Sequence, residues 1–123
     1  MASNLISVER ERGERVCTRC VLADRPWTRV RGLLGRKRLE ADEGVLLRPV
    51  GAIHTMFMRF PIDVVFLDRE YSVVKVVENV RPWRFAGARG AKAVLELRKG
   101  AAARRLRVGE SLVIVPNQTR RAA

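Results

Sequence analysis

The chain has 123 residues, 47% of them hydrophobic, which suits one folded domain that needs no disulfide or metal to hold its core. No apolar run approaches the roughly 18 residues of a membrane span, and no signal peptide is visible, so we expect no membrane contact and a cytoplasmic location. The net charge of +12 makes this a basic protein and invites a nucleic-acid function. Its arginines are spread along the chain, however, so a nucleic-acid partner is an alternative that we do not favour.

The first half of the chain is predicted to hold a hairpin, a helix and a short strand. Gly13 favours a tight connection between two strands. Pro26 suits the first turn of a helix and Gly35 its end, while Pro49 ends the strand before it. The expected elements are strands over 5–10 and 14–22, a helix over 26–34 and a strand over 44–48.

Strand follows strand from residue 53 onward. Pro61 blocks a continuous ladder, and the nearly all-apolar run after it predicts a strand buried on both faces. An Ala- and Arg-rich segment, 100–107, is interpreted as a second short helix. The expected strands are 53–58, 62–67, 71–79, 91–97 and 111–115, with 116–123 as a frayed tail. The pattern predicts a mainly β fold over 1–123, a single compact barrel or sandwich with two short helices.

Cys17 and Cys20 form a C-x-x-C motif inside an expected strand. A zinc site needs about four ligands, and a thioredoxin-like motif would open a helix after a strand. Residues i and i+3 of a strand point to opposite faces, so we expect the two sulfur atoms to diverge. We therefore interpret both as reduced cysteines in or beside the core, and we expect no metal and no cofactor.

The segment 51–68 holds the single histidine and most of the methionines and phenylalanines. If 53–58 is extended, His54, Met56 and Met58 share one face of the strand. An imidazole and two thioethers suit Cu(I), but methionines more often fill gaps in a core, and we favour that interpretation.

Asp63 interrupts the apolar run that follows Pro61, and a buried carboxylate needs partners. We favour a structural role in which it accepts backbone N–H groups. In the alternative, His54 or Arg59 folds back across the proline, and His54 and Asp63 form an acid–base pair. Glu96, on the opposite face of its strand from the alternating apolar residues, is a further candidate acid.

A basic, aromatic loop over 81–85 places Trp83 beside two arginines, which suits a sugar ring, a base or a partner protein. Because no catalytic set is recognisable, our leading hypothesis is a non-enzymatic domain that binds an unknown small ligand or protein. The alternatives are a small enzyme with the His54–Asp63 pair and a nucleic-acid-associated protein. The expected ligand-binding residues are His54, Met56, Met58, Arg59, Asp63 and Trp83.

Four segments together resemble domain-of-unknown-function family 192, a group of small prokaryotic domains. They are 53–68, Gly32-Leu33-Leu34-Gly35, Val94-Leu95-Glu96-Leu97 and Gly100, so the resemblance spans about 23–115. It implies a compact, jelly-roll-like β fold and carries over no catalytic residue. Many relatives look exported, whereas this chain shows no signal sequence.

Overall fold

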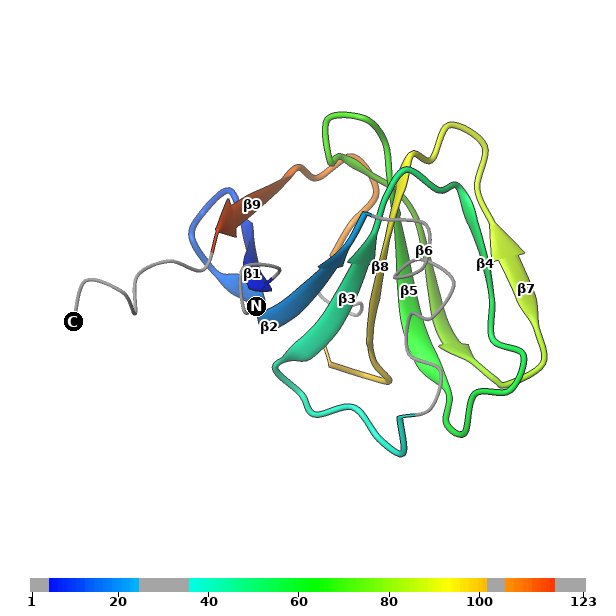
Figure 1. Cartoon of the computed structure of the whole chain (residues 1–123). Coiled ribbons are helices and arrows are strands. Elements are labelled where there is room, and N and C mark those ends of the chain that lie inside the picture. The colour runs from blue at the N-terminus through cyan, green and yellow to red at the C-terminus, as the bar shows by residue number, and fades with distance from the viewer. Residues whose placement is uncertain (1–4, 25–35, 102–105, 117–123) are drawn as a thin grey trace.

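Nine strands form the regular secondary structure of residues 5–24, 36–101 and 106–116, which are the residues that the computed structural model describes (Figure 1). No helix occurs among these residues, and so none that could span a membrane. The strands are β1 (Leu5–Arg10), β2 (Arg15–Ala23), β3 (Glu43–Leu47), β4 (Ala52–His54), β5 (Ile62–Leu67), β6 (Val73–Val80), β7 (Phe85–Gly87), β8 (Ala93–Arg98) and β9 (Leu112–Pro116).

Seven of the strands make one large sheet in the order β6-β5-β8-β3-β2-β1-β9, and β4 and β7 pair separately. The central pair β2–β3 is parallel, and the other pairs are antiparallel. At one end of the large sheet the first strand pairs with the last, from Ile6 opposite Pro116 to Arg10 opposite Leu112. Figure 1 shows the β4–β7 ribbon beside the β5–β6 half of the large sheet.

The large sheet buries both of its faces. All six residues of β5 are buried, because alternate side chains enter two different hydrophobic clusters. Leu46, Val65 and Leu95 belong to the cluster on one face. Val45, Val64 and Phe66 belong to the other, which Ile53 of β4 covers. The ribbon therefore lies against the large sheet as a second layer, a sandwich-like arrangement.

The large sheet curls without closing into a barrel. Its two edge strands are β6 and β9, and they meet only at their starts, where Ser72 and Ser111 form an isolated bridge. The Leu112 N–H donates to the Tyr71 carbonyl at 2.9 Å beside this bridge. The expected barrel is therefore wrong, whereas the mainly β class and the buried strand 62–67 are confirmed.

Four other expectations need comment. The helix over 26–34 falls on residues outside the described ranges. For the helix over 100–107, Gly100 and Ala101 form a turn and a bend, Leu106 and Arg107 are not helical, and 102–105 are not described. The strand expected over 53–58 ends at His54, and Phe85, expected as the last residue of the basic aromatic loop, begins β7.

Candidate functional site

Thr55 joins the loop after β4 to the loop before β7, although the two are 26 to 29 residues apart in sequence. Its buried hydroxyl donates to the Arg81 carbonyl at 2.6 Å and accepts the Arg84 N–H at 2.9 Å. Its backbone N–H donates to the Arg84 carbonyl at 2.9 Å, and its carbonyl accepts the N–H of Trp83 at 3.0 Å and of Met58 at 3.2 Å. These bonds turn the chain out of the strand at residue 55.

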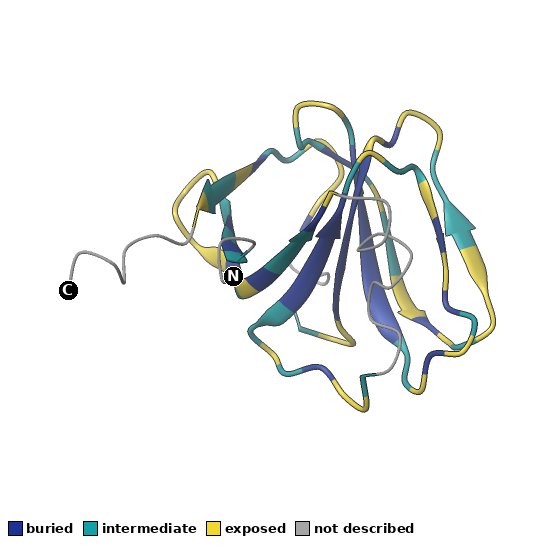
Figure 2. Ribbon diagram, viewed as in Figure 1, coloured by how far each residue is buried: buried dark blue, intermediate teal, exposed yellow. Residues whose placement is uncertain are grey.

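The two joined loops present a cluster of exposed rings, which we call the aromatic tip: His54, Phe57, Trp83 and Phe85. Phe57 is 67%, Trp83 54% and Phe85 77% exposed, and large apolar side chains left in water at one place commonly mark a contact surface. The Phe57 and Trp83 rings pack at a centroid distance of 4.6 Å, and those of His54 and Phe85 at 6.3 Å. Figure 2 shows the β4–β7 ribbon and its loops as largely exposed or half-buried beside the buried central strands.

The backbone is strained at the two rings that touch each other. Phe57 has a φ of 68° and Trp83 a φ of 67°, in the left-handed region that bulky residues rarely adopt. Such conformations cost roughly 1–3 kcal/mol each and persist where the surroundings enforce them. Here the hydrogen bonds of Thr55 are the enforcing contacts. The chain thus holds these rings outward at an energetic cost, which points to a use for them.

The charge around the aromatic tip is positive. Arg59, Arg81 and Arg84 are exposed, and the segments 54–62 and 81–87 contain no acidic residue. None of these three arginines joins an ion pair within the described part of the chain. The tip thus combines ring faces with guanidinium groups that remain available to an anion.

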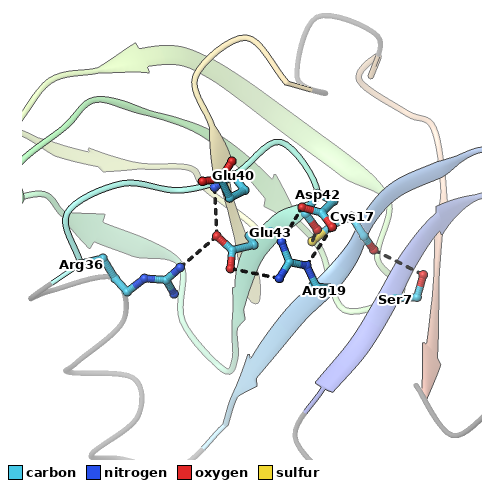
Figure 3. Close-up of polar contacts among 7 residues, drawn as sticks. All are labelled: Ser7, Cys17, Arg19, Arg36, Glu40, Asp42 and Glu43. Carbon is cyan, nitrogen blue, oxygen red and sulfur yellow. Dashed lines mark hydrogen bonds and ion pairs between the residues drawn. The ribbon is translucent and has the colours of Figure 1, made fainter. Parts of the chain in front are cut away.

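Some other arginines are paired with carboxylates, among them Arg19 and Arg36 around the 36–43 loop (Figure 3). Arg19 donates to both carboxylate oxygens of Asp42, at 2.8 and 2.9 Å, and this pairing lowers the pKa of Asp42. Arg36 binds Glu43 at 2.9 Å, and the same carboxylate oxygen accepts the Glu40 N–H at 2.9 Å. Carboxylates thus balance the charges of Arg19 and Arg36, unlike those of Arg59, Arg81 and Arg84.

Asp63 lies inside the protein and away from solvent, unlike the exposed His54. Its Oδ1 accepts the N–H of Asn79 at 2.9 Å, and its Oδ2 accepts the N–H of Gly100 at 2.8 Å. The pairing of β5 with β6 shifts register between Ile62 and Val64, and Asn79 lies at this bulge with a φ of 56°. Asp63 thus has the structural role favoured from the sequence, and neither of its hydrogen bonds involves His54.

The remaining predicted site residues are divided between surface and core. His54 Nδ1 accepts the Met56 N–H at 3.3 Å, and Met56 is half-buried. Met58 is buried in the hydrophobic cluster beneath β4, and Arg59 is exposed. The extended segment that would align His54, Met56 and Met58 on one face is therefore not formed. The structure brings His54 and Trp83 into the aromatic tip, whereas Asp63 and Met58 lie in the interior.

Glu96 is only 4% exposed at the centre of the large sheet, between Val45 of β3 and Val64 of β5. Burial raises the pKa of its carboxyl group to about 7. That value suits a general acid or base near neutral pH, but a carboxyl group that is only 4% exposed is out of reach of a substrate. We therefore regard Glu96 first as a pH-sensitive group of the fold.

The two cysteines converge, contrary to the sequence-based prediction. Ile6 pairs with Cys20 and Val8 with Cys17, so three residues of β2 span the distance of two on β1. This bulge turns both thiols into the same buried cluster, and the Asp42 carbonyl accepts the bulge N–H groups of Thr18 at 3.1 Å and Arg19 at 2.9 Å. A hydrogen bond with the Cys17 thiol, together with burial, raises the pKa of Cys20. Both cysteines are free thiols, as the sequence suggested.

Sequence reasoning missed Thr55, Phe57 and Phe85 as members of the site. Phe57 stands in an alternating run that favours a strand, and nothing local shows that its ring turns outward. The one usable signal was the basic aromatic loop at Trp83, which did point to this end of the fold.

The described residues define a small β domain with an open sheet and a cluster of exposed rings at one end. The chain belongs to domain-of-unknown-function family 192, described as uncharacterised, whose model matches residues 7–114. This confirms the resemblance found in the sequence. No match is found among curated proteins.

Two solved structures share the fold. One is a protein of unknown function from Novosphingobium aromaticivorans DSM 12444, with 26% identity over 89% of this chain and 83% of that one, and a TM-score of 0.75. The other comes from Sinorhizobium meliloti 1021 and is described as a "putative transcription regulator". It has 24% identity over 89% of this chain and 91% of that one, and a TM-score of 0.75. Their similarity supports the open β architecture.

Proposed function

We propose that this protein is a non-enzymatic binding domain that captures its ligand on the aromatic tip. The observation that carries the proposal is the pair Phe57 and Trp83, exposed and held in left-handed backbone by the bonds of Thr55. Ring faces bind other rings through stacking and apolar contact. The three exposed arginines Arg59, Arg81 and Arg84 add attraction for negative charge. The preferred ligand is therefore a small anion that contains a ring, such as a nucleoside phosphate or an acidic sugar.

The enzymatic alternative has less support. An acid–base pair needs His54 and Asp63 within hydrogen-bond reach of each other or of one substrate. Asp63 is fully buried with both oxygens engaged by backbone N–H groups, whereas His54 lies at the surface. A binding role requires only that His54 lie at the surface, where its ring packs beside that of Phe85.

Single-stranded nucleic acid is the second candidate ligand. Proteins that bind single strands combine stacking aromatic side chains with basic groups along the backbone path. The aromatic tip has both, and the net charge of +12 would strengthen the attraction at low salt. An oligonucleotide that binds far more tightly than its mononucleotide would favour this candidate over the small ligand.

Fluorescence of Trp83 gives a direct test. The chain has two tryptophans, so a Trp27→Phe background leaves Trp83 as the sole reporter. We expect adenosine monophosphate, a glucuronate oligomer or a short oligonucleotide to change its emission, and Phe57→Ala or Arg84→Gln to weaken that binding about tenfold. Val113→Ala, at an exposed apolar residue of β9, is the matched control. Unchanged emission with all three probes, or equal binding by the tip variants, would contradict the proposal.

A further inference from the structure

We propose that the protein has a second binding site, for a small organic anion, in a cavity at the opposite end of β5 from the aromatic tip. The cavity has a volume of about 500 Å³, within the range of small-molecule sites. Its walls come from residues just after β2, β3 and β5 and from the start of β8. Arg59 lies in the loop before β5, whereas Asp68 of the cavity follows its end, so roughly 20 Å of strand separates the two sites.

Arg48 lines this cavity, and its guanidinium has two partners. Its Nη1 donates a short hydrogen bond to the Tyr71 hydroxyl, and its Nη2 lies 3.9 Å from Asp24 Oδ2. Its backbone N–H donates to the Ala23 carbonyl at 3.2 Å. A guanidinium carries five N–H donors, so the fixed side chain keeps donors for a ligand. The Tyr71 hydroxyl accepts from Arg48, so its own hydrogen remains to be donated.

Tyr71 reaches the cavity through a strained backbone. Its φ is 64°, again in the left-handed region that a bulky residue rarely adopts. The 68–72 turn enforces this conformation: Asp68 Oδ1 accepts the N–H groups of Glu70 and Ser72, each at 2.9 Å. The Tyr71 N–H donates to the Asp68 carbonyl at 3.0 Å. The turn thus stores strain to direct a hydroxyl at Arg48, an arrangement typical of a preorganised site.

The charge and polarity of the walls select the ligand class. The lining holds two carboxylates and three cations: Asp68 Oδ1 accepts two N–H groups of its own turn, and Asp24 Oδ2 lies 3.9 Å from Arg48 Nη2. Arg69 and Lys92 are exposed at the rim and join no ion pair among the described residues. Pro49 and Ala93 add apolar surface. The site therefore suits a carboxylate or phosphate group that carries a short apolar body.

Two-dimensional NMR titration tests this site separately from the aromatic tip. The probes are benzoate, phenyl phosphate and inorganic phosphate, with neutral benzamide as the charge control. We expect the anions to shift amide signals of 48–50, 68–72 and 92–93, and Arg48→Gln to remove these shifts alone. The ring-bearing anions also suit the aromatic tip, so shifts of 55–59 and 83–85 with benzoate or phenyl phosphate report that site, which Phe57→Ala weakens and Arg48→Gln leaves unchanged. Benzoate alone would assign a carboxylate site, and phenyl phosphate alone a phosphate-ester site.

Three variants of the cavity and one control variant complete the test. Arg48→Gln and Tyr71→Phe should each weaken binding about tenfold, because each removes a hydrogen bond to an anion. Tyr71→Phe keeps the ring in place, and Lys92→Gln changes an exposed side chain, so both should fold. Arg15→Gln, an exposed charge at the start of β2, should bind like the wild type. No localised shift at probe concentrations of roughly 10 mM, or equal shifts with benzamide, would overturn the proposal.

Discussion

The Asp63→Ala substitution would leave two buried backbone N–H groups without an acceptor. The Asn79 N–H lies 2.9 Å from one carboxylate oxygen and the Gly100 N–H 2.8 Å from the other, and the side chain is fully buried. An orphaned buried polar group costs about 1–3 kcal/mol, so the two together cost roughly 2–6 kcal/mol. Domains of this size are stable by roughly 5–15 kcal/mol, so the loss should be large.

Urea unfolding followed by circular dichroism measures this loss. We expect the midpoint of Asp63→Ala to fall strongly at an unchanged slope, because the surface exposed on unfolding stays the same. Asp63→Asn keeps one carbonyl acceptor and should fall by about half as much. Asp42→Asn, which breaks an exposed pair with Arg19, is the control and should shift the midpoint far less.

A loss below about 1 kcal/mol for Asp63→Ala would refute the structural role of this carboxylate. It would mean that water or a rearranged backbone satisfies both N–H groups. The case for an acid–base pair with His54 would then be open again.

Three further predictions concern other buried groups. The pKa of Glu96 is about 7 in the folded protein, against an ordinary value of 4.5 in the unfolded chain. Because the unfolded chain therefore loses this proton at a lower pH, the free energy of unfolding should fall by about 3 kcal/mol as the pH rises from 4.5 to 7. Glu96→Gln should remove that slope in urea midpoints measured across this range, and an unchanged slope would contradict it. Thr55→Val should lower the free energy of unfolding by about 2 kcal/mol and loosen Trp83, seen as a red-shifted emission in the Trp27→Phe background. Thr55→Ser keeps the hydroxyl and should retain both the stability and the emission of the wild type. Cys17 and Cys20, 1% and 0% exposed, should react with a thiol reagent only at the rate of unfolding, and fast labelling in native buffer would show that the bulge opens.

The sequence predicted those parts of the fold that depend on local pattern. The apolar run 62–67 forms β5 with the expected bounds, and the Gly13 hairpin joins β1 to β2. Asp63 could be interpreted as structural because an isolated carboxylate in such a run needs backbone partners.

The parts that it missed depend on contacts between distant segments. The run around Phe57 alternates like a strand, but Thr55 bonds to Arg81 and Arg84, and no local pattern reveals those partners. Likewise, the two cysteines share a face only because β2 has a bulge against β1. The rule that successive residues of a strand point to opposite faces fails at a bulge, where one strand has an extra residue without a partner on its neighbour.

The pairing of β1 with β9 has a consequence for how the chain folds. During synthesis β1 leaves the ribosome about a hundred residues before β9. The edge of β1 that pairs with β9 therefore has no hydrogen-bonding partner until the chain is almost complete. A chain shortened before Leu112 would keep that edge permanently, and an unpaired edge invites strands from other molecules. The last strand thus covers the edge of β1 and becomes the edge of the large sheet in its place, although it contributes nothing to either proposed binding site.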